Sequence, residues 1–489
     1  MAAHKGMPDF DVIIIGAGIS GINFAYRMQE RNPELSYCIL DSRHEIGGTW
    51  SLFQYPGIRS DSDLYTFGFA WRPWTGNDTI VHGSIIRQYL EDSAAQEGID
   101  KRIRFHHKVN KLNWSSSSNM WDFDITVNDT KMVSLKSRFV FLGTGYYDYQ
   151  EPLRADIPGI HNFQGKVIHP QFWPDDLDYV NKRVVIIGSG ATAITLLPSL
   201  ATSAAHVTML QRSPTYVASL PTRGAFEAIV SRLLPRSAAH RVIRIKWMLF
   251  SLFMVSMCRL FPRAAKSFLL RETRKLLPPG MSLEPDFVPS YKPWEQRLCL
   301  CPDGDFYAAI RSGKASIHTG SIETITTSSI KLASGKELHP DIIVTATGLK
   351  LRMAGGIIIT IDDEPYEIPD HFAWRAAMLE GLPNLVLSIG YANASWTLGA
   401  DSTAQLACRL LTRMRKHGLS VIVPRMKAEE REALEERPFL ALSATYVKKG
   451  GNAFPKSAST VPWQPRSYYW RDLAIARWGD VKKGMEWLR

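Results

Sequence analysis

Two glycine-rich loops, each lying between a run of β-branched residues and a helical pattern, predict an α/β protein with two Rossmann-like dinucleotide-binding domains. The first loop, Gly16-x-Gly18-x-x-Gly21, follows "DVIII", and the second, Gly188-x-Gly190-x-x-Ala193, follows "RVVII". The chain has 489 residues, enough for about three domains. We expect a basic, mostly helical insertion near 222–296 within the second domain.

The first loop has the residues that a bound pyrophosphate requires. Gly16 permits the tight turn, Gly18 lets the backbone approach the ligand, and Gly21 lets the helix pack close to the strand. The next predicted strand, "SYCILD", ends in Asp41, 20 residues beyond Gly21. A carboxylate there accepts hydrogen bonds from a ribose diol and disfavours a 2′-phosphate. The first nucleotide is therefore predicted to be FAD or NAD rather than NADP.

The second loop predicts a different nucleotide. Its following strand, "HVTMLQRSP", carries Gln211, Arg212 and Ser213 where the first domain has Asp41. A guanidinium beside a hydroxyl suits a 2′-phosphate, which predicts NADPH. The alternative is that Arg212 is a solvated surface charge.

Two such domains in one chain indicate hydride transfer from NADPH to a flavin. Disulfide reductases, oxidases and oxygen-inserting enzymes all use this chemistry. The five cysteines include no C-x-x-C pair and no metal-ligand set, which argues against a disulfide reductase and against a metal site. Reduced thiols of this kind are typical of a cytoplasmic protein.

The positive charge of the chain is concentrated in one segment. The formal net charge is +11, and the stretch Pro221–Leu300 holds 14 Lys and Arg against 5 Asp and Glu. It includes an apolar run, Trp247–Cys258, of 12 residues, too short for a bilayer that needs about 20. We expect a buried helix there, and the flanking bases leave peripheral membrane contact open. No nucleic-acid-binding motif accompanies these bases, so no nucleic-acid partner is expected.

Two aspartates, Asp61 and Asp63, follow the first domain's second strand in a loop rich in aromatic residues. Each carboxylate is expected either to be capped by backbone amides or to pair with a base, and local sequence leaves both open. Three short strands within 104–114, 120–129 and 138–147 are expected next. The third ends in Gly143-x-Gly145 and should return the chain to the first sheet.

Between the two glycine loops lies Phe163-x-Gly165-x-x-x-His169-x-x-x-Trp173-Pro174. This pattern resembles the fingerprint of the flavin-dependent Baeyer–Villiger monooxygenases. Gly47-Gly48-x-Trp50, followed by "YPG", is similar to a second motif of that family. Longer runs, such as "YPGIRSDSDLYTFGF" and "GYANASWTL", are similar to its subgroup of ethionamide-activating monooxygenases.

The resemblance implies an activity. Members of the family use FAD, NADPH and O2 to convert ketones into esters or lactones through a C4a-peroxide of the flavin. Oxidation of sulfides or thioamides at sulfur is the implied second activity. Two alternatives stay open: a flavin monooxygenase that oxygenates nitrogen or sulfur, and a nucleotide-binding redox sensor.

The resemblance also implies roles for individual residues. Arg297 matches the active-site arginine, and Asp61 matches the carboxylate that holds it. Gln296 departs from the pattern, because many members have Lys there, and this places more weight on Arg212. The fingerprint should lie at the domain junction, with Phe163 and Trp173 as anchors and His169 as a structural hydrogen-bonding group.

The remaining expectations concern cofactor contacts and domain bounds. The residues predicted to bind FAD are Gly16, Gly18, Ser20, Gly21, Asp41, Gly48, Thr49, Trp50, Asp61 and Val109. Those predicted to bind NADP are Arg59, Ser60, Gly188, Ser189, Gly190, Ala191, Thr192, Gln211, Arg212 and Ser213. The FAD domain is expected at 1–148 and 351–489, and the NADPH domain at 149–350. The aromatic C-terminal segment 458–473 should either cover the cleft or simply close its domain.

Overall fold

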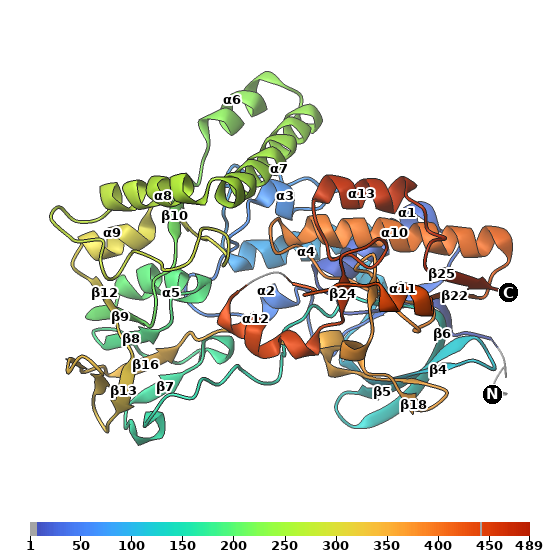
Figure 1. Cartoon of the computed structure of the whole chain (residues 1–489), viewed down its shortest axis with the longest axis horizontal. Coiled ribbons are helices and arrows are strands. Elements are labelled where there is room, and N and C mark those ends of the chain that lie inside the picture. Colours follow the sequence, from blue (N-terminus) through green and yellow to red (C-terminus); the bar gives the residue numbers. More distant parts are fainter. Residues whose placement is uncertain (1–6, 441–442) are drawn as a thin grey trace.

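The computed structural model, which describes residues 7–440 and 443–489, is built around two β-sheets at opposite ends of the long axis of the molecule (Figure 1). The larger sheet uses strands from both sides of the interval 149–350, and the smaller sheet uses strands inside it. An α/β fold with two Rossmann-like units is thereby confirmed, while the domain bounds themselves stay a prediction.

The larger sheet has nine strands in the order β18-β17-β4-β5-β6-β1-β2-β3, with β21 also paired to β6. Their bounds are β1 Phe10–Ile15, β2 Tyr37–Leu40, β3 Ile103–Arg104, β4 His107–Ser115, β5 Met120–Val127, β6 Lys131–Leu142, β17 Ile358–Ile361, β18 Glu364–Pro365 and β21 Leu385–Leu387.

Strand β6 joins two halves of this sheet. Its first residues pair antiparallel with β5, and its last residues, Ser137–Leu142, run parallel to β1. Val12, Ile13 and Ile14 of β1 are completely buried, as expected for a central parallel strand covered on both faces. The three strands expected between 104 and 147 are thus β4, β5 and β6.

The smaller sheet is entirely parallel, in the order β12-β9-β8-β16-β7. Its strands are β7 Lys166–Ile168, β8 Arg183–Ile187, β9 His206–Gln211, β12 Ala315–Thr319 and β16 Ile342–Thr345. Beside it lies a three-stranded antiparallel sheet of β13 Ile322–Ile325, β14 Ile330–Leu332 and β15 Glu337–Leu338.

Helices cover the larger sheet and pack it against the C-terminal part of the chain. Helix α1 (Ile19–Arg31) follows β1 and packs against α10 (Trp396–His417), which in turn contacts α13 (Tyr469–Trp478). A buried ion pair joins the first two helices, with 2.8 Å between Arg27 Nε and Asp401 Oδ1. The other helices of this part are α2 Thr49–Leu52, α3 Leu64–Phe67, α4 Gly83–Gln96, α11 Ala428–Glu432 and α12 Thr445–Gly450.

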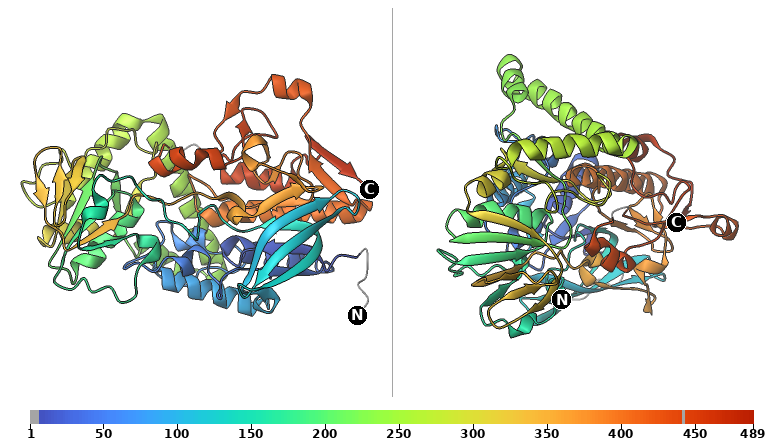
Figure 2. Two further views of the ribbon diagram at one scale, coloured as in Figure 1. Left: turned by 90° about the horizontal axis from the view of Figure 1, so that it is seen from below. Right: turned by 60° about the vertical axis from the view of Figure 1, so that its left-hand side comes forward.

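The expected helical insertion consists of α6 (Ala225–Leu233), α7 (Arg236–Leu260) and α8 (Pro262–Leu276), after which no helix forms until α9 (Asp305–Arg311). Helices α6 and α7 rise from the body of the molecule as an arm (Figures 1 and 2). Strands β10 (Val217–Leu220) and β11 (Cys299–Pro302) pair in parallel at the base of the insertion. Helix α5 (Ala191–Ala201) follows the second glycine loop.

The prediction of a buried helix at Trp247–Cys258 was wrong for one side of that segment. Trp247, Met248, Val255 and Cys258 are buried, but Leu249 and Phe253 keep 52% and 59% of their surface exposed. Among the described residues no single helix is long and apolar enough to cross a membrane. Helices α7 and α8 meet that criterion only as a pair bent by 114°.

Short elements complete the chain. The strands are β19 Ala373–Trp374, β20 Met378–Leu379, β22 Val421–Pro424, β23 Glu436–Arg437, β24 Ser457–Ala458 and β25 Met485–Leu488. The 3-10 turns are η1 Asp100–Arg102, η2 Ile160–Asn162, η3 Pro170–Phe172, η4 Met353–Gly356, η5 Ile368–Asp370 and η6 Gly451–Ala453.

The chain crosses from the larger sheet to the smaller one between β6 and β7 and returns between β16 and β17, and these two crossings are hydrogen-bonded to each other. The Asp148 amide donates to the Lys350 carbonyl at 2.8 Å, and the Arg352 amide donates to the Tyr146 carbonyl at 2.9 Å. An isolated antiparallel bridge joins Tyr147 and Leu351. The two sheets are therefore connected by a short two-stranded link rather than by separate single strands.

Candidate active site

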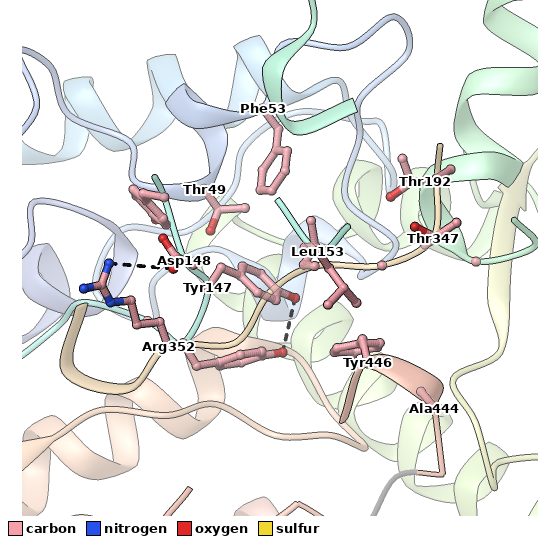
Figure 3. Close-up of a pocket in the computed structure, with 18 of the residues that line it drawn as sticks. Thr49, Phe53, Tyr147, Asp148, Leu153, Thr192, Thr347, Arg352, Ala444 and Tyr446 are labelled. Atoms are coloured by element: carbon pink, nitrogen blue, oxygen red, sulfur yellow. Dashed lines mark hydrogen bonds and ion pairs between the residues drawn. The ribbon is translucent and has the colours of Figure 1, made fainter. Parts of the chain in front are cut away.

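A cavity of about 940 Å³ lies between the two sheets, and residues of both glycine-rich loops line it. Figure 3 shows its central part, where Tyr147 lies among Leu153, Tyr446 and Phe53. The lining residues include Gly16 and Gly18 from the first loop, and Gly188 and Gly190 from the second. The topology thus directs both predicted nucleotide sites into one space.

The first loop presents the N-terminus of α1 to this cavity. The helix begins at Ile19, and its N-cap, Gly18, offers no side-chain cap. Amides of the first turn are therefore available to an anion. Gly16 has a φ of +104°, and a Cβ at Gly21 would lie 1.9 Å from the Gly16 carbonyl oxygen. Gly21 does not line the cavity; it is required for the packing of α1 on the loop.

Asp41 lies at the end of β2 with its carboxylate fixed by backbone amides. Oδ2 accepts from the Ala17 amide at 2.7 Å, and Oδ1 accepts from the Arg43 amide at 2.8 Å. Burial raises the pKa of Asp41, and these two hydrogen bonds oppose that shift. The residue lines the cavity, as expected of a carboxylate that accepts hydrogen bonds from a ribose diol.

The other residues predicted for FAD line the same cavity: Ser20, Gly48, Thr49, Trp50, Asp61 and Val109. Ser20 is also held from the far end of the sequence, because Trp396 Nε1 donates to Ser20 Oγ at 3.1 Å. Trp396 lines the cavity as well. Its segment, "GYANASWTL", carries part of the family resemblance, but the sequence predicted no role for Trp396 itself.

The second loop presents α5 in the same way. Gly190 is the N-cap, without a side-chain cap, and a Cβ added to it would meet nothing within 4 Å. Ser189 Oγ donates to the Ser213 carbonyl at 3.0 Å, which ties the loop to the end of β9. Cavity-lining residues here also include Gly188, Ala191, Thr192, Arg212 and Ser213.

Gln211 differs from this group. It is buried and does not line the cavity. Its Nε2 donates to the Asp286 carbonyl at 2.7 Å and to Thr319 Oγ1 at 3.0 Å. The side chain joins β9 to β12 and to the segment that follows α8, so its contacts are structural.

Two residues predicted for NADP come from the FAD side of the cavity. Arg59 lines it, and its guanidinium forms an ion pair with Asp305, the first residue of α9. Ser60 also lines it, and Ser60 Oγ donates to the Ser62 carbonyl at 2.9 Å. Arg59 therefore fixes the loop of Asp61 against the smaller sheet's helices.

Arg297 lies in the cavity and is held mainly by main-chain oxygens. Nη2 donates to the Tyr391 carbonyl at 3.1 Å and Nε donates to the Ala392 carbonyl at 3.4 Å. Asp61 Oδ2 lies 3.9 Å from Arg297 Nη1. Desolvation lowers the pKa of Arg297, but Asp61 and nearby tyrosines outweigh it and raise that pKa above its ordinary value. The guanidinium therefore stays charged at every working pH.

The two aspartates of the aromatic loop have separate roles. Asp61 pairs with Arg297, whereas Asp63 is the N-cap of α3 and accepts from the Thr66 amide at 2.7 Å and from Thr66 Oγ1 at 2.6 Å. Burial raises the pKa of Asp63 to about 6. The structure thus assigns one carboxylate to a base and the other to a backbone amide, a choice that the sequence left open.

Three tyrosines for which the sequence predicted no role lie near Arg297. Tyr146, Tyr147 and Tyr446 all line the cavity, and Figure 3 labels the last two. The Tyr146 and Tyr147 hydroxyls are 3.2 Å apart. Burial raises the pKa of both Tyr147 and Tyr446. Their hydroxyls therefore remain protonated at neutral pH and can donate hydrogen bonds to a substrate oxygen.

The fingerprint residues lie in and beside the smaller sheet, outside the cavity lining. A Cβ at Gly165 would lie 2.5 Å from the Phe163 ring and 2.6 Å from the Asp341 carbonyl oxygen, so close packing requires glycine here. Trp173 packs against the hydrophobic core that α5 forms with the smaller sheet. His169 Nδ1 accepts from the Gln171 amide at 3.2 Å, and Gln171 Nε2 donates to the Asp148 carbonyl at 2.6 Å. The segment thus contacts the first chain crossing.

The C-terminal segment 458–473 contributes no lining residue; Ala444, Tyr446 and Lys449 line this side of the cavity instead. The segment contacts the site indirectly. Tyr391, whose carbonyl accepts from Arg297, donates from its Oη to Asp472 Oδ2 at 2.8 Å. Of the two expectations for this segment, the contacts agree with the domain-closing role.

The residues present fit two dinucleotides. Two uncapped helix N-termini open on one cavity, a fixed carboxylate stands at one of them, and a guanidinium with a serine stands at the other. All five cysteines are buried and free. Burial raises the pKa of Cys299, which lines the cavity, to about 12, so that thiol does not supply a thiolate.

Residues 13–222 match the family model described as pyridine nucleotide-disulphide oxidoreductase. The FAD-containing monooxygenase EthA of Mycobacterium tuberculosis (strain ATCC 25618 / H37Rv) is 45% identical over 472 residues, which are 96% of this chain and 96% of that protein.

Two solved structures share the fold over nearly the whole length. An oxidised steroid monooxygenase bound to NADP superposes with a TM-score of 0.76 at 19% identity, covering 98% of this chain and 99% of that one. Cyclohexanone monooxygenase with bound ε-caprolactone gives a TM-score of 0.75 at 18% identity, with the same coverage.

The raised pKa of Asp63 predicts a pH effect on stability. The folded state holds the Asp63 proton more tightly than the unfolded state, where the ordinary value is 3.8. The stability that this proton contributes is therefore complete below about pH 4 and is lost as the pH rises to about 6. Asp63→Asn should remove this loss and raise the free energy of unfolding at pH 7 by about 1–3 kcal/mol relative to wild type, with a higher melting temperature as the result. The two proteins should differ much less at pH 4.

Thermal unfolding monitored by circular dichroism at both pH values measures this effect. Asp124→Asn, at an exposed position of β5, is the matched control and should leave the pH profile unchanged. Equal effects of Asp63→Asn at the two pH values would contradict the assignment.

Proposed function

Because this chain belongs to the FAD-containing monooxygenases, we propose that it uses NADPH and O2 to insert one oxygen atom beside the carbonyl group of a ketone. The ketone, O2, NADPH and a proton give an ester or lactone, NADP+ and water. Sulfides and thioamides, which gain one oxygen at sulfur, are the proposed second substrate class. The observation that carries the proposal is the position of Arg297 in a cavity shared by both nucleotide-binding loops.

The two helix N-termini would hold the pyrophosphates of FAD and NADPH, with Asp41 on the FAD ribose and Arg212 on the 2′-phosphate. When bound and reduced, the flavin supplies the activated oxygen. Its position between the loops would place the reacting atoms near Arg297, since the guanidinium, Gly16 and Gly188 line one space.

Arg297 would stabilise the negative charge that develops on oxygen during attack on the carbonyl group. It is suited to this role by its permanent charge and by its anchoring to the Tyr391 and Ala392 carbonyls. A fixed cation of this kind needs no reorganisation in the transition state. Asp61, at 3.9 Å, would orient the guanidinium without neutralising it through a close bidentate pair.

The tyrosines would define the substrate side of the cavity. Protonated hydroxyls on Tyr147 and Tyr446 can donate to a carbonyl or thiocarbonyl group, and their rings provide apolar surface. The same elements that exclude water from the reacting atoms would thus also bind an uncharged substrate.

The proposed reaction is tested by product analysis. We expect purified holoenzyme with NADPH and air to convert members of a panel of aliphatic and aryl ketones into esters one oxygen heavier, and a thioether into its sulfoxide. Mass spectrometry of products and NADPH absorbance would be followed together. Sulfoxide without any ester would favour the heteroatom monooxygenase, and failure of NADPH to reduce the flavin would favour the redox sensor.

Replacement of Arg297 should separate flavin reduction from oxygen transfer. We expect Arg297→Ala to retain reduction by NADPH while ester formation falls by about 10²–10³-fold, the usual effect of removing one stabilising donor. The NADPH consumed should then appear as hydrogen peroxide. Lys292→Ala, an exposed cation on the same loop, is the control and should behave as wild type. Normal ester yield from Arg297→Ala would remove Arg297 from the mechanism.

Arg212 should determine the preference for NADPH over NADH. We expect Arg212→Gln to raise KM for NADPH by about 10–100-fold, because a hydrogen bond to a charged group contributes about 1.5–3 kcal/mol. KM for NADH, which has no 2′-phosphate, should change little. Stopped-flow flavin reduction with each nucleotide measures both, with Lys314→Gln as a control on the surface of the same unit. A parallel loss with NADPH and NADH would contradict the assignment.

A further inference from the structure

Helix α7 carries a stripe of apolar side chains that no part of the described chain covers. Val242, Ile245, Leu249, Phe253 and Leu260 are all exposed. Their spacing of three, four, four and seven residues places them on one face of the helix. Leu260 keeps 71% of its surface accessible. We call this set of five residues the outer stripe.

The apolar exposure continues over the neighbouring helices. Ile229 and Leu233 of α6, Phe261 at the corner and Phe268 of α8 are exposed as well. Of the 22 large hydrophobic side chains exposed in the described chain, 11 lie between Phe226 and Phe268. Such a concentration marks an interaction surface rather than the scattered apolar residues of an ordinary protein surface.

The opposite face of α7 is already occupied, so the stripe cannot turn inward. Ile243 and Trp247 pack with Tyr65, and Met248 packs with Tyr391 and Leu398. Arg244 is buried as well, and its Nη1 donates to the Gly68 carbonyl at 2.9 Å. Rotation of the helix would break these contacts.

The charges around the stripe identify its partner. Residues 222–276 contain 12 Lys and Arg against 2 Asp and Glu. One of the acids, Glu227, is buried and paired with Lys246 at 2.7 Å. Arg232, Arg236, Arg241, Arg259 and Arg263 are exposed. A second copy of so basic a surface would be repelled, whereas an anionic surface would be attracted.

We propose that α6–α8 bind the surface of an anionic lipid bilayer, with the outer stripe in the interfacial region and the arginines on the lipid headgroups. An amphipathic helix with apolar residues on one face and cations beside them lies in the plane of the interface. The bend of 114° between α7 and α8 agrees with a helix pair that lies on a bilayer rather than one that crosses it.

The test is co-sedimentation of the FAD-loaded full chain with two kinds of vesicles, phosphatidylcholine alone and phosphatidylcholine with phosphatidylglycerol. We expect binding to the second and much weaker binding to the first. Leu249→Ser with Phe253→Ser should weaken binding by at least about tenfold, since two large apolar side chains leave the interface. Arg241→Gln with Arg259→Gln should weaken it by about 25-fold, because each surface cation contributes about fivefold.

Matched control variants distinguish loss of the proposed membrane-binding surface from a general loss of folding or of exposed side chains elsewhere. Ile85→Ser with Ile358→Ser removes exposed apolar groups elsewhere, and Lys101→Gln with Lys131→Gln removes exposed cations elsewhere. Both pairs should bind as wild type, and every variant should keep its flavin absorbance and melting temperature. Three results would overturn the proposal: no binding of wild type to the anionic vesicles, equal binding by the stripe variant, or self-association in the absence of vesicles that the stripe substitutions abolish.

Discussion

The site depends on the hydrogen-bonded link between the two chain crossings. Asp148 and Lys350, together with Tyr146 and Arg352, join the crossings through main-chain bonds of 2.8 and 2.9 Å. Because the link is double, the two glycine loops keep their orientation toward one cavity. Tyr146 and Tyr147 belong to the link itself and line that cavity. Any change in the relative position of the sheets would therefore move these two tyrosines together with the glycine loops.

The nucleotide-binding elements could be predicted because their determinants are local. A buried strand, a glycine turn and a helix lie within some 20 residues, and the carboxylate or guanidinium that selects the nucleotide follows at the end of the next strand. Gln211 shows the limit of this inference. It stands beside Arg212 in the sequence, but strand alternation directs its side chain to the opposite side, where it contacts β12.

Contacts between distant segments could not be predicted in this way. Arg297 and Asp61 are 236 residues apart, and only a family resemblance connected them. The hydrogen bonds from Arg297 to the Tyr391 and Ala392 carbonyls could not be predicted from the sequence, because every residue has a carbonyl group. The exposure of Leu249 and Phe253 was not predicted for a related reason. The segment 247–258 is apolar on every face of the helix, so its sequence does not indicate which face the rest of the chain will cover.

The main-chain hold on Arg297 has a consequence for how such an enzyme can diversify. The carbonyl oxygens at 391 and 392 remain after any side-chain replacement that leaves the backbone path unchanged, so the proposed catalytic cation keeps its hydrogen bonds when neighbouring side chains vary. The tyrosines and other cavity residues can then change size and polarity without disturbing the charge on which the proposed reaction relies. Because main-chain atoms anchor the arginine and side chains shape the cavity, the range of accepted substrates can change while the proposed reaction stays the same.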